Sequence, residues 1–135
     1  MAATVSYNSA NRAVERDCSR LYFKVAFSAV ADGTEDGTLV ALPAGTTILD
    51  AGITCSVAAT GTGTETASLR LSTTGAIYAG TSDNGGTVNV RDVLEFATRE
   101  VSAAETLTLR NTHAGGAGTT AATYLVWVDV LRTSF

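Results

Sequence analysis

The longest run of alternating apolar residues lies near the C-terminus, at residues 121–131. Successive residues of a β-strand point to opposite faces, so one face of this run consists of Tyr124, Val126, Val128 and Val130. The other face mixes apolar residues with one carboxylate. An apolar strand of this kind would promote aggregation at an open sheet edge. We therefore predict a central strand with a buried even-numbered face. The other face is either a second buried layer or a contact surface.

Shorter runs of the same kind occur along the rest of the chain, at a spacing of roughly 8–12 residues that is typical of antiparallel sandwiches and barrels. The acidic, Gly-containing residues 31–37 predict a turn, and residues 60–64 and 112–120 predict loops. The pattern predicts an all-β protein, an antiparallel jelly-roll-like β-sandwich of about eight strands. The predicted strands are residues 21–30, 38–42, 46–58, 67–72, 88–90, 93–96, 105–111 and 121–131.

The long strand at residues 46–58 changes parity in its middle. Ile48 is even-numbered, whereas Ile53 and Cys55 are odd-numbered, and Gly52 lies between them. A β-bulge adds one residue to a strand and so reverses the side on which later residues point. The sequence therefore predicts a bulge at Gly52.

The first nineteen residues differ from the rest of the chain because they are mostly polar. Residues 4–7 are suited to a short strand, and the segment that follows carries little apolar surface. We divide the chain into an extended N-terminal arm at residues 1–19 and a single β-sandwich domain at residues 20–135. Two interpretations of the arm stay open: it is a frayed terminus, or it becomes ordered on a neighbouring subunit.

Composition supports a single domain and narrows the classes of partner. The chain has 135 residues, with 22 Thr, 22 Ala and 13 Gly, and its formal net charge is −4. Thr favours strands, and the acidic balance argues against a nucleic-acid-binding protein, which would carry a basic stripe. The sequence contains no apolar run of about 18 residues, so it predicts no membrane span. The first twenty residues lack the features of a secretory signal. These features suit a protein that is made inside a cell and released by lysis.

Signatures of catalysis and of cofactors are missing. His113 is the only histidine and lies in a Gly-rich stretch, where neither an orienting partner nor a nucleophile is evident. No Cys/His cluster has zinc spacing, and no phosphate-binding loop motif occurs. We therefore expect no enzymatic activity, no catalytic residue and no cofactor.

Acidic residues at two places in the sequence are candidates for a metal site or an ion pair. Oxygen ligands suit calcium, but Asp32, Glu35 and Asp36 match no EF-hand spacing, and a solvated acidic turn is the preferred interpretation; no metal site is predicted. Asp129 interrupts the last apolar strand. It either faces solvent or pairs with an arginine on an adjacent strand, such as Arg110 or Arg70.

The two cysteines, Cys18 and Cys55, do not form a disulfide framework. A chain with two cysteines and no export signal favours reduced thiols. Cys55 has the parity of the apolar residues Ile53 and Val57, so we expect it to act as a small buried apolar side chain.

The order of strands and turns resembles the small jelly-roll virion proteins of tailed bacteriophages, namely capsid cement or decoration proteins and other head accessory proteins. The resemblance rests on a Leu-Pro-Ala-Gly turn at residues 42–45 that leads into a long strand. It continues through a Thr/Gly loop, the strand at 67–72, and the segment 103–109 followed by a Gly/Ala/Thr-rich loop and a Val-rich strand. This resemblance covers residues 38–131 in style and includes no fixed motif, so no site residues are carried over.

What the resemblance implies is a virion protein on the capsid surface that is assembled in the host cytoplasm. It would be a homodimer or homotrimer that binds the major capsid protein and clamps neighbouring subunits. The alternative is a tail, fibre or lectin-like module that binds glycans, for which Tyr78 beside Asp83 and Asn84 is the candidate grouping. Neither function involves nucleic acid or membrane. The candidate interface residues, on the arm and on the second face of the last strand, are Val5, Tyr7, Arg12, Arg16, Leu125, Trp127 and Leu131.

Overall fold

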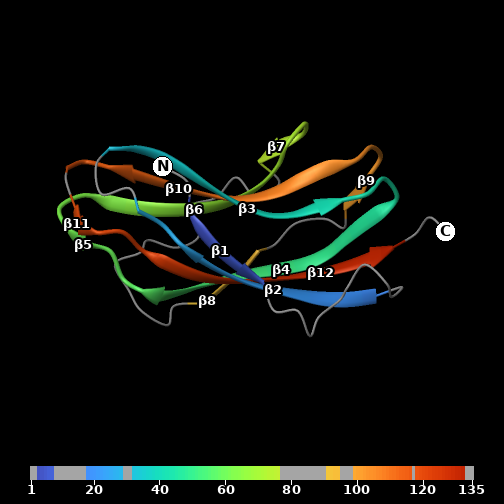
Figure 1. The fold of residues 1–135 in the computed structure, drawn as a ribbon, viewed down its shortest axis with the longest axis horizontal. Helices are drawn as coiled ribbons and strands as arrows, with labels where there is room; N and C mark the ends of the chain where they lie inside the picture. Colours follow the sequence, from blue (N-terminus) through green and yellow to red (C-terminus); the bar gives the residue numbers. More distant parts are fainter. Residues whose placement is uncertain are drawn as a thin grey trace.

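The computed structural model describes residues 3–7, 18–28, 32–76, 91–94, 99–116 and 118–132, and every statement below concerns these residues. Their strands form two facing antiparallel sheets (Figure 1). No helix among them is long and apolar enough to cross a membrane. The strands are β1 (Thr4–Tyr7), β2 (Cys18–Ala26), β3 (Gly33–Leu42), β4 (Thr46–Val57), β5 (Thr60–Gly61), β6 (Thr64–Leu71), β7 (Gly75–Ala76), β8 (Arg91–Leu94), β9 (Arg99–Val101), β10 (Glu105–Ala114), β11 (Gly118–Thr120) and β12 (Thr123–Arg132).

The main strands alternate between the two sheets as the chain proceeds. The first sheet has the order β1-β2-β12-β4-β8, with β9 also paired to β4, and the second has the order β3-β10-β6-β7. Each connection from β2 to β3, β3 to β4 and β4 to β6 therefore crosses from one sheet to the other. This is the arrangement of a jelly roll, in which two Greek keys form a double sheet, and the predicted fold class is confirmed. A third, two-stranded sheet of β5 and β11 lies at one end of the sandwich (Figure 1).

The last strand lies at the centre of the first sheet. β12 pairs with β2 on one side and with β4 on the other, along nearly its whole length. The side chains of Tyr124, Val126, Val128 and Val130 face the interior and are buried, as predicted. The ring of Tyr124 meets Phe27 edge to face, with 5.9 Å between the ring centroids, a favourable arrangement for two aromatic rings. The core therefore forms around the strand whose sequence is most apolar.

Strand β4 contains the predicted change of parity, but the bulge is not at Gly52. Asp129 pairs with Asp50, whereas Val130 pairs with Ile48, so Leu49 is the extra residue. The inward face then continues at Ala51 and Ile53, which are fully buried. Gly52 itself pairs directly with Trp127 in the regular ladder, and the predicted position was wrong by three residues.

The predicted acidic turn at residues 31–37 is also wrong. Gly33–Leu42 is one strand, and β10 pairs with it from Gly33 to Leu42. Glu35, Gly37 and Leu39 point inward, and the residues between them point outward. Three acids and two glycines in seven residues gave this segment the composition of a turn and concealed its alternation.

The N-terminal strand belongs to the sandwich. Residues 4–7 form β1, which pairs with β2 as an edge strand. Val5 packs against the core, and its methyl group would lie 3.4 Å from a Cβ placed on Gly37 of β3. The short predicted strand is therefore present and covers part of the opening between the two sheets. The division into an arm and a domain stays a prediction, because residues 8–17 lie outside the described ranges.

Candidate functional site

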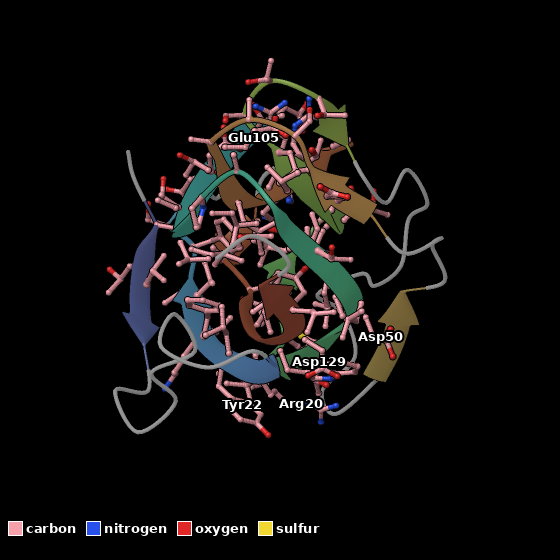
Figure 2. The ribbon with its side chains drawn as sticks, turned by 90° about the vertical axis from the view of Figure 1, so that its right-hand side faces the viewer. Arg20, Tyr22, Asp50, Glu105 and Asp129 are labelled. Carbon is pink, nitrogen blue, oxygen red and sulfur yellow. The ribbon has the colours of Figure 1, made fainter. Side chains whose placement is uncertain are left out.

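The outer face of the first sheet is the candidate interaction surface, which we define as Arg20, Tyr22 and Lys24 of β2, Leu125, Trp127 and Asp129 of β12, and Asp50 and Thr54 of β4. These side chains stand in three rows across the strands. The register places Asp129 between Arg20 and Asp50, Trp127 between Tyr22 and Gly52, and Leu125 between Lys24 and Thr54. Figure 2 shows Arg20, Tyr22 and Asp129 on the side of the sheet that faces away from the sandwich interior.

Large apolar side chains are exposed on this sheet. Among the described residues, the exposed large hydrophobic side chains are Tyr22, Val57 and Leu125, with exposed fractions of 43%, 50% and 44%. They belong to β2, β4 and β12, which are adjacent strands. The odd-numbered face of β12 is therefore not a second buried layer within this chain, because Leu125 is exposed.

Trp127 lies flat over the neighbouring strand β4. A Cβ placed on Gly52 would lie 2.3 Å from the indole Nε1 and 2.4 Å from Cε2, so the indole occupies the space that any side chain at position 52 would need. On the other neighbouring strand, the guanidinium carbon of Arg20 lies 4.2 Å from the centre of the Trp127 ring. Such a cation–π contact is favourable, and Gly52 and Arg20 together hold the indole in place.

Asp129 pairs with Arg20 and not with Arg110 or Arg70. Arg20 Nε donates to Asp129 Oδ1 at 2.6 Å, and Arg20 Nη2 donates to Asp129 Oδ2 at 2.8 Å. This bidentate geometry is favourable between a guanidinium and a carboxylate. This pair raises the pKa of Arg20 above its ordinary value, with the hydrogen bond to Asp129 as the main cause. The prediction of an arginine on an adjacent strand was right, but the partner named was wrong. Arg110 instead pairs with Asp36 on the opposite sheet, at 2.7 and 2.9 Å.

The outer face of the second sheet has a different character. Its outward residues on β3, β10 and β6 are almost all threonine or serine, together with the Asp36–Arg110 pair and Arg70. The two outer faces of the sandwich are therefore unlike: one carries exposed aromatic and aliphatic side chains, and the other is polar. The outward threonine and serine residues of the second sheet include Thr34, Thr38, Thr66, Ser68, Thr106, Thr108 and Thr112.

The candidate interface residues fall in different places. Leu125 is exposed, and Trp127 and Leu131 are half-buried on the outer face of β12. Val5 is half-buried against the core, and Tyr7 is on β1. Arg12 and Arg16 lie outside the described residues, as does the Tyr78, Asp83 and Asn84 grouping of the glycan hypothesis.

A cluster of buried polar side chains lies between the sheets, and the sequence analysis missed it. Glu65 of β6 and His113 of β10 are each 3% exposed, and Glu65 Oε1 lies 3.0 Å from His113 Nδ1. Asn111 donates to the other oxygen of Glu65, and the hydroxyl of Tyr124 donates to Asn111 Oδ1 at 3.3 Å. His113 is thus in the interior at the end of a strand, and its expected position in a loop was wrong.

The signal that could have found this cluster is parity. Glu65 has the parity of Leu69 and Leu71, while Asn111 and His113 have the parity of Leu107 and Leu109. Buried polar groups are usually hydrogen-bonded to one another, so inward polar residues on adjacent strands predict a network.

The three acids considered for a cation separate in the structure. Glu35 is buried and accepts hydrogen bonds from the backbone amide and the hydroxyl of Ser28. Asp36 pairs with Arg110 on the outer face, and Asp32 accepts a hydrogen bond from the amide of Gly116 at 3.1 Å. Within the described ranges, no group of three His, Cys, Asp or Glu residues is placed to hold a metal ion.

The side chain of Cys55 is fully buried. It lies in the core, as expected for a small apolar side chain. Its Sγ lies 3.4 Å from the carbonyl oxygen of Val57.

Glu105 is another buried carboxylate and lies at the start of β10 in the second sheet. Glu105 Oε1 accepts hydrogen bonds from the backbone amides of Thr73 and Thr74 at 2.7 and 2.9 Å. Burial alone would raise the pKa of Glu105, but these hydrogen bonds outweigh it and the pKa is lowered. Glu105 also borders a shallow hollow of about 320 Å³ beside Leu42 and Pro43. The carboxylate is fully used in holding the turn after β6, which assigns it a structural role.

Comparison with known proteins identifies the fold. No protein-family model matches the chain, and no curated protein matches it in sequence. Three solved structures with a similar fold come from phage capsids. A chain in "Acidic stable capsid structure of Helicobacter pylori bacteriophage KHP30" has a TM-score of 0.63 at 13% identity, over 98% of this chain and 94% of that one.

Two further capsid structures contain similar chains. In the capsid of Ralstonia phage GP4 the TM-score is 0.61 at 16% identity, over 88% of this chain and 86% of that one. In the capsid asymmetric unit of cyanophage Pam1 it is 0.57 at 19% identity, over 97% and 86%. At these identities the likeness establishes a shared jelly-roll fold over nearly the whole chain.

Proposed function

We propose that this chain is a structural virion protein of a tailed bacteriophage, a cement or decoration protein that binds the outer capsid shell. The observation that carries the proposal is the likeness in fold to chains from three phage capsids, which extends over most of both chains in every case. A fold alone does not determine a function. The partner is therefore argued from the surface.

The candidate interaction surface has the composition of a protein-binding surface. Tyr, Trp and Arg are enriched among the residues that contribute most to binding free energy, and Tyr22, Trp127 and Arg20 lie on adjacent strands of one face. Leu125 adds an exposed aliphatic side chain beside them. Trp127 and Arg20 are already held in one arrangement by Gly52 and Asp129, and a preorganised surface loses less conformational entropy on binding.

The opposite outer face indicates the orientation of the bound protein. A face of threonine, serine and one paired Arg–Asp suits contact with water, and an exposed apolar patch suits contact with a partner. We infer that the face of β2, β12 and β4 rests on the major capsid protein and that the face of β3, β10 and β6 points to solvent. Stable contact would need an interface of about 1,000 Å² or more. One sheet face contributes part of that area, and a dimer or trimer would place the same face of each subunit on the shell and so bind through several contacts at once.

A capsid-binding experiment tests this function. Capsids of the encoding phage, prepared without this chain, are mixed with the purified protein and sedimented. The wild-type protein should co-sediment to saturation, and Leu125→Glu should weaken binding at least tenfold because it places a charge in the apolar contact.

Thr38→Glu is the matched control. It adds the same carboxylate at an exposed strand position on the opposite face, and its binding should equal that of the wild type. The proposed function is contradicted if the wild-type protein does not bind capsids. The proposed orientation is contradicted if Thr38→Glu weakens binding and Leu125→Glu does not.

A further inference from the structure

The ring of His113 lies between two hydrogen-bond acceptors. Nδ1 is 3.0 Å from Glu65 Oε1, and Nε2 is 2.8 Å from the carbonyl oxygen of Gly116. A neutral imidazole carries a single N–H, and an ionised carboxylate and a carbonyl oxygen can only accept. Both contacts are therefore satisfied only if the Glu65–His113 pair holds two protons in total. One lies on Nε2, and the other lies on Nδ1, which donates it to Glu65 Oε1.

The groups that surround the ring favour this extra proton. Burial alone would lower the pKa of His113. The hydrogen bonds that the ring donates to Glu65 and to the Gly116 carbonyl oxygen, and the negative charges of Glu65 and Asp32, raise this pKa above its usual value. Glu35 is a further buried acid, and it pairs with Asn111 in the register of β3 and β10. Tyr124 reaches the cluster through Asn111.

The carbonyl of Gly116 lies where the loop after β10 packs closely against the loop between β5 and β6. Asp32 accepts from the amide of Gly116 while His113 holds its carbonyl. A Cβ on Gly116 would lie 2.3 Å from Thr62 Oγ1, and a Cβ on Gly63 would lie 2.6 Å from the carbonyl oxygen of Ala114. Immediately beyond these contacts, β11 pairs with β5 and closes the end of the sandwich seen at the left of Figure 1.

We propose that the Glu65–His113 pair is a proton-operated latch that holds the β5–β11 end of the sandwich closed. When the pair loses its extra proton, the remaining N–H stays on Nδ1, because a bare Nδ1 would place a lone pair against the Glu65 carboxylate. Nε2 then turns a lone pair toward the Gly116 carbonyl oxygen. That contact becomes repulsive, and the loop that leads into β11 is released from the ring.

This latch is independent of the proposed capsid role, since it concerns contacts within one chain. The sign of the effect follows from the raised pKa of His113. The closed end is fully stabilised at a pH below the ordinary histidine value, 6.5, and the stabilisation is lost as the pH rises through the folded-state pKa.

The test is an NMR titration, which is unambiguous because His113 is the only histidine. The imidazole ¹⁵N shifts and the amide shifts of Gly116 and Gly118 are followed as the pH is raised from acid to alkaline. We expect both ring nitrogens to be protonated at pH 6.5, and ring and loop amides to change together with a single midpoint above that value. Glu65→Gln should lower the midpoint by about one pH unit or more, because it removes the adjacent negative charge.

Asp36→Asn is the control, since Asp36 is an acid on the outer face of the same sandwich, and its midpoint should match the wild type. The latch is overturned if the ring is neutral at pH 6.5. It is also overturned if the amides of Gly116 and Gly118 do not change across the ring titration. These two readings come from the wild-type protein, so they decide the question even where a variant does not fold.

Discussion

Gly52→Ala tests the packing of Trp127 on the neighbouring strand. The added methyl group would lie 2.3–2.7 Å from three atoms of the indole, well inside van der Waals contact. The ring cannot move aside freely, because Arg20 stacks on it and is held in turn by both oxygens of Asp129. Overpacking of this kind costs about 1–3 kcal/mol, which for a chain of this length lowers the Tm by roughly 4–12 °C.

The same substitution should have the opposite sign when the indole is absent. Ala is preferred to Gly inside a strand by roughly 0.5–1 kcal/mol, because Gly loses more conformational entropy on folding. In a Trp127→Ala background, Gly52→Ala should therefore be neutral or slightly stabilising. The coupling free energy between positions 52 and 127 should be about 1–4 kcal/mol, which is the difference between these two effects.

Urea denaturation of the four proteins measures this cycle. Far-UV circular dichroism is a suitable signal, because Trp127 is the only tryptophan and its fluorescence is lost in two of the four. If Gly52→Ala costs the same free energy with and without Trp127, the indole does not lie over Gly52 and the account of this face is wrong.

Three further predictions concern other parts of the molecule. Glu105 has a lowered pKa, so its contribution to stability is present above pH 4.5 and is lost as the pH falls through the folded-state value. Glu105→Gln should flatten the acid limb of stability measured by urea titration, and an unchanged slope there would contradict the assignment. Asp129→Asn should cost less than about 1 kcal/mol because the Arg20 pair is partly exposed, and this cost should shrink at high salt; a salt-independent loss would be the contrary result in a thermal melt. In a Cys18→Ser variant, the buried Cys55 thiol should react with a thiol reagent only at denaturant concentrations that unfold the protein, whereas fast labelling without denaturant would show that it is accessible.

The fold was predictable because its strongest strands keep strict alternation. In residues 21–27 and 124–130 every second residue is apolar, which makes one face of each strand apolar almost throughout, and the structure buries those faces. The central position of β12 followed from its apolar character, since such a strand needs a partner on both sides. The turn predicted at residues 31–37 failed because glycine and acidic residues are compatible with a strand when a long partner such as β10 pairs with it.

The sites were harder to predict, because pairing between distant strands decides them. Arg20 and Asp129 are 109 residues apart, and only the antiparallel register of β2 and β12 brings them together. Gly52 was interpreted as a bulge because no local signal distinguishes a bulge from a glycine that makes room for a side chain on the next strand. A loop was predicted at His113 because glycines follow it in the sequence, although its parity matches that of the buried leucines of β10.

The most direct measurement of the central claim is a cryo-electron microscopy map of the virion of the encoding phage. The account predicts density for this jelly roll on the outside of the capsid, with Tyr22, Leu125 and Arg20 against the shell and Thr38 and Thr108 facing solvent. A map in which the chain is missing from the particle, or in which the face of β2, β12 and β4 points to solvent with no partner on it, would contradict the account.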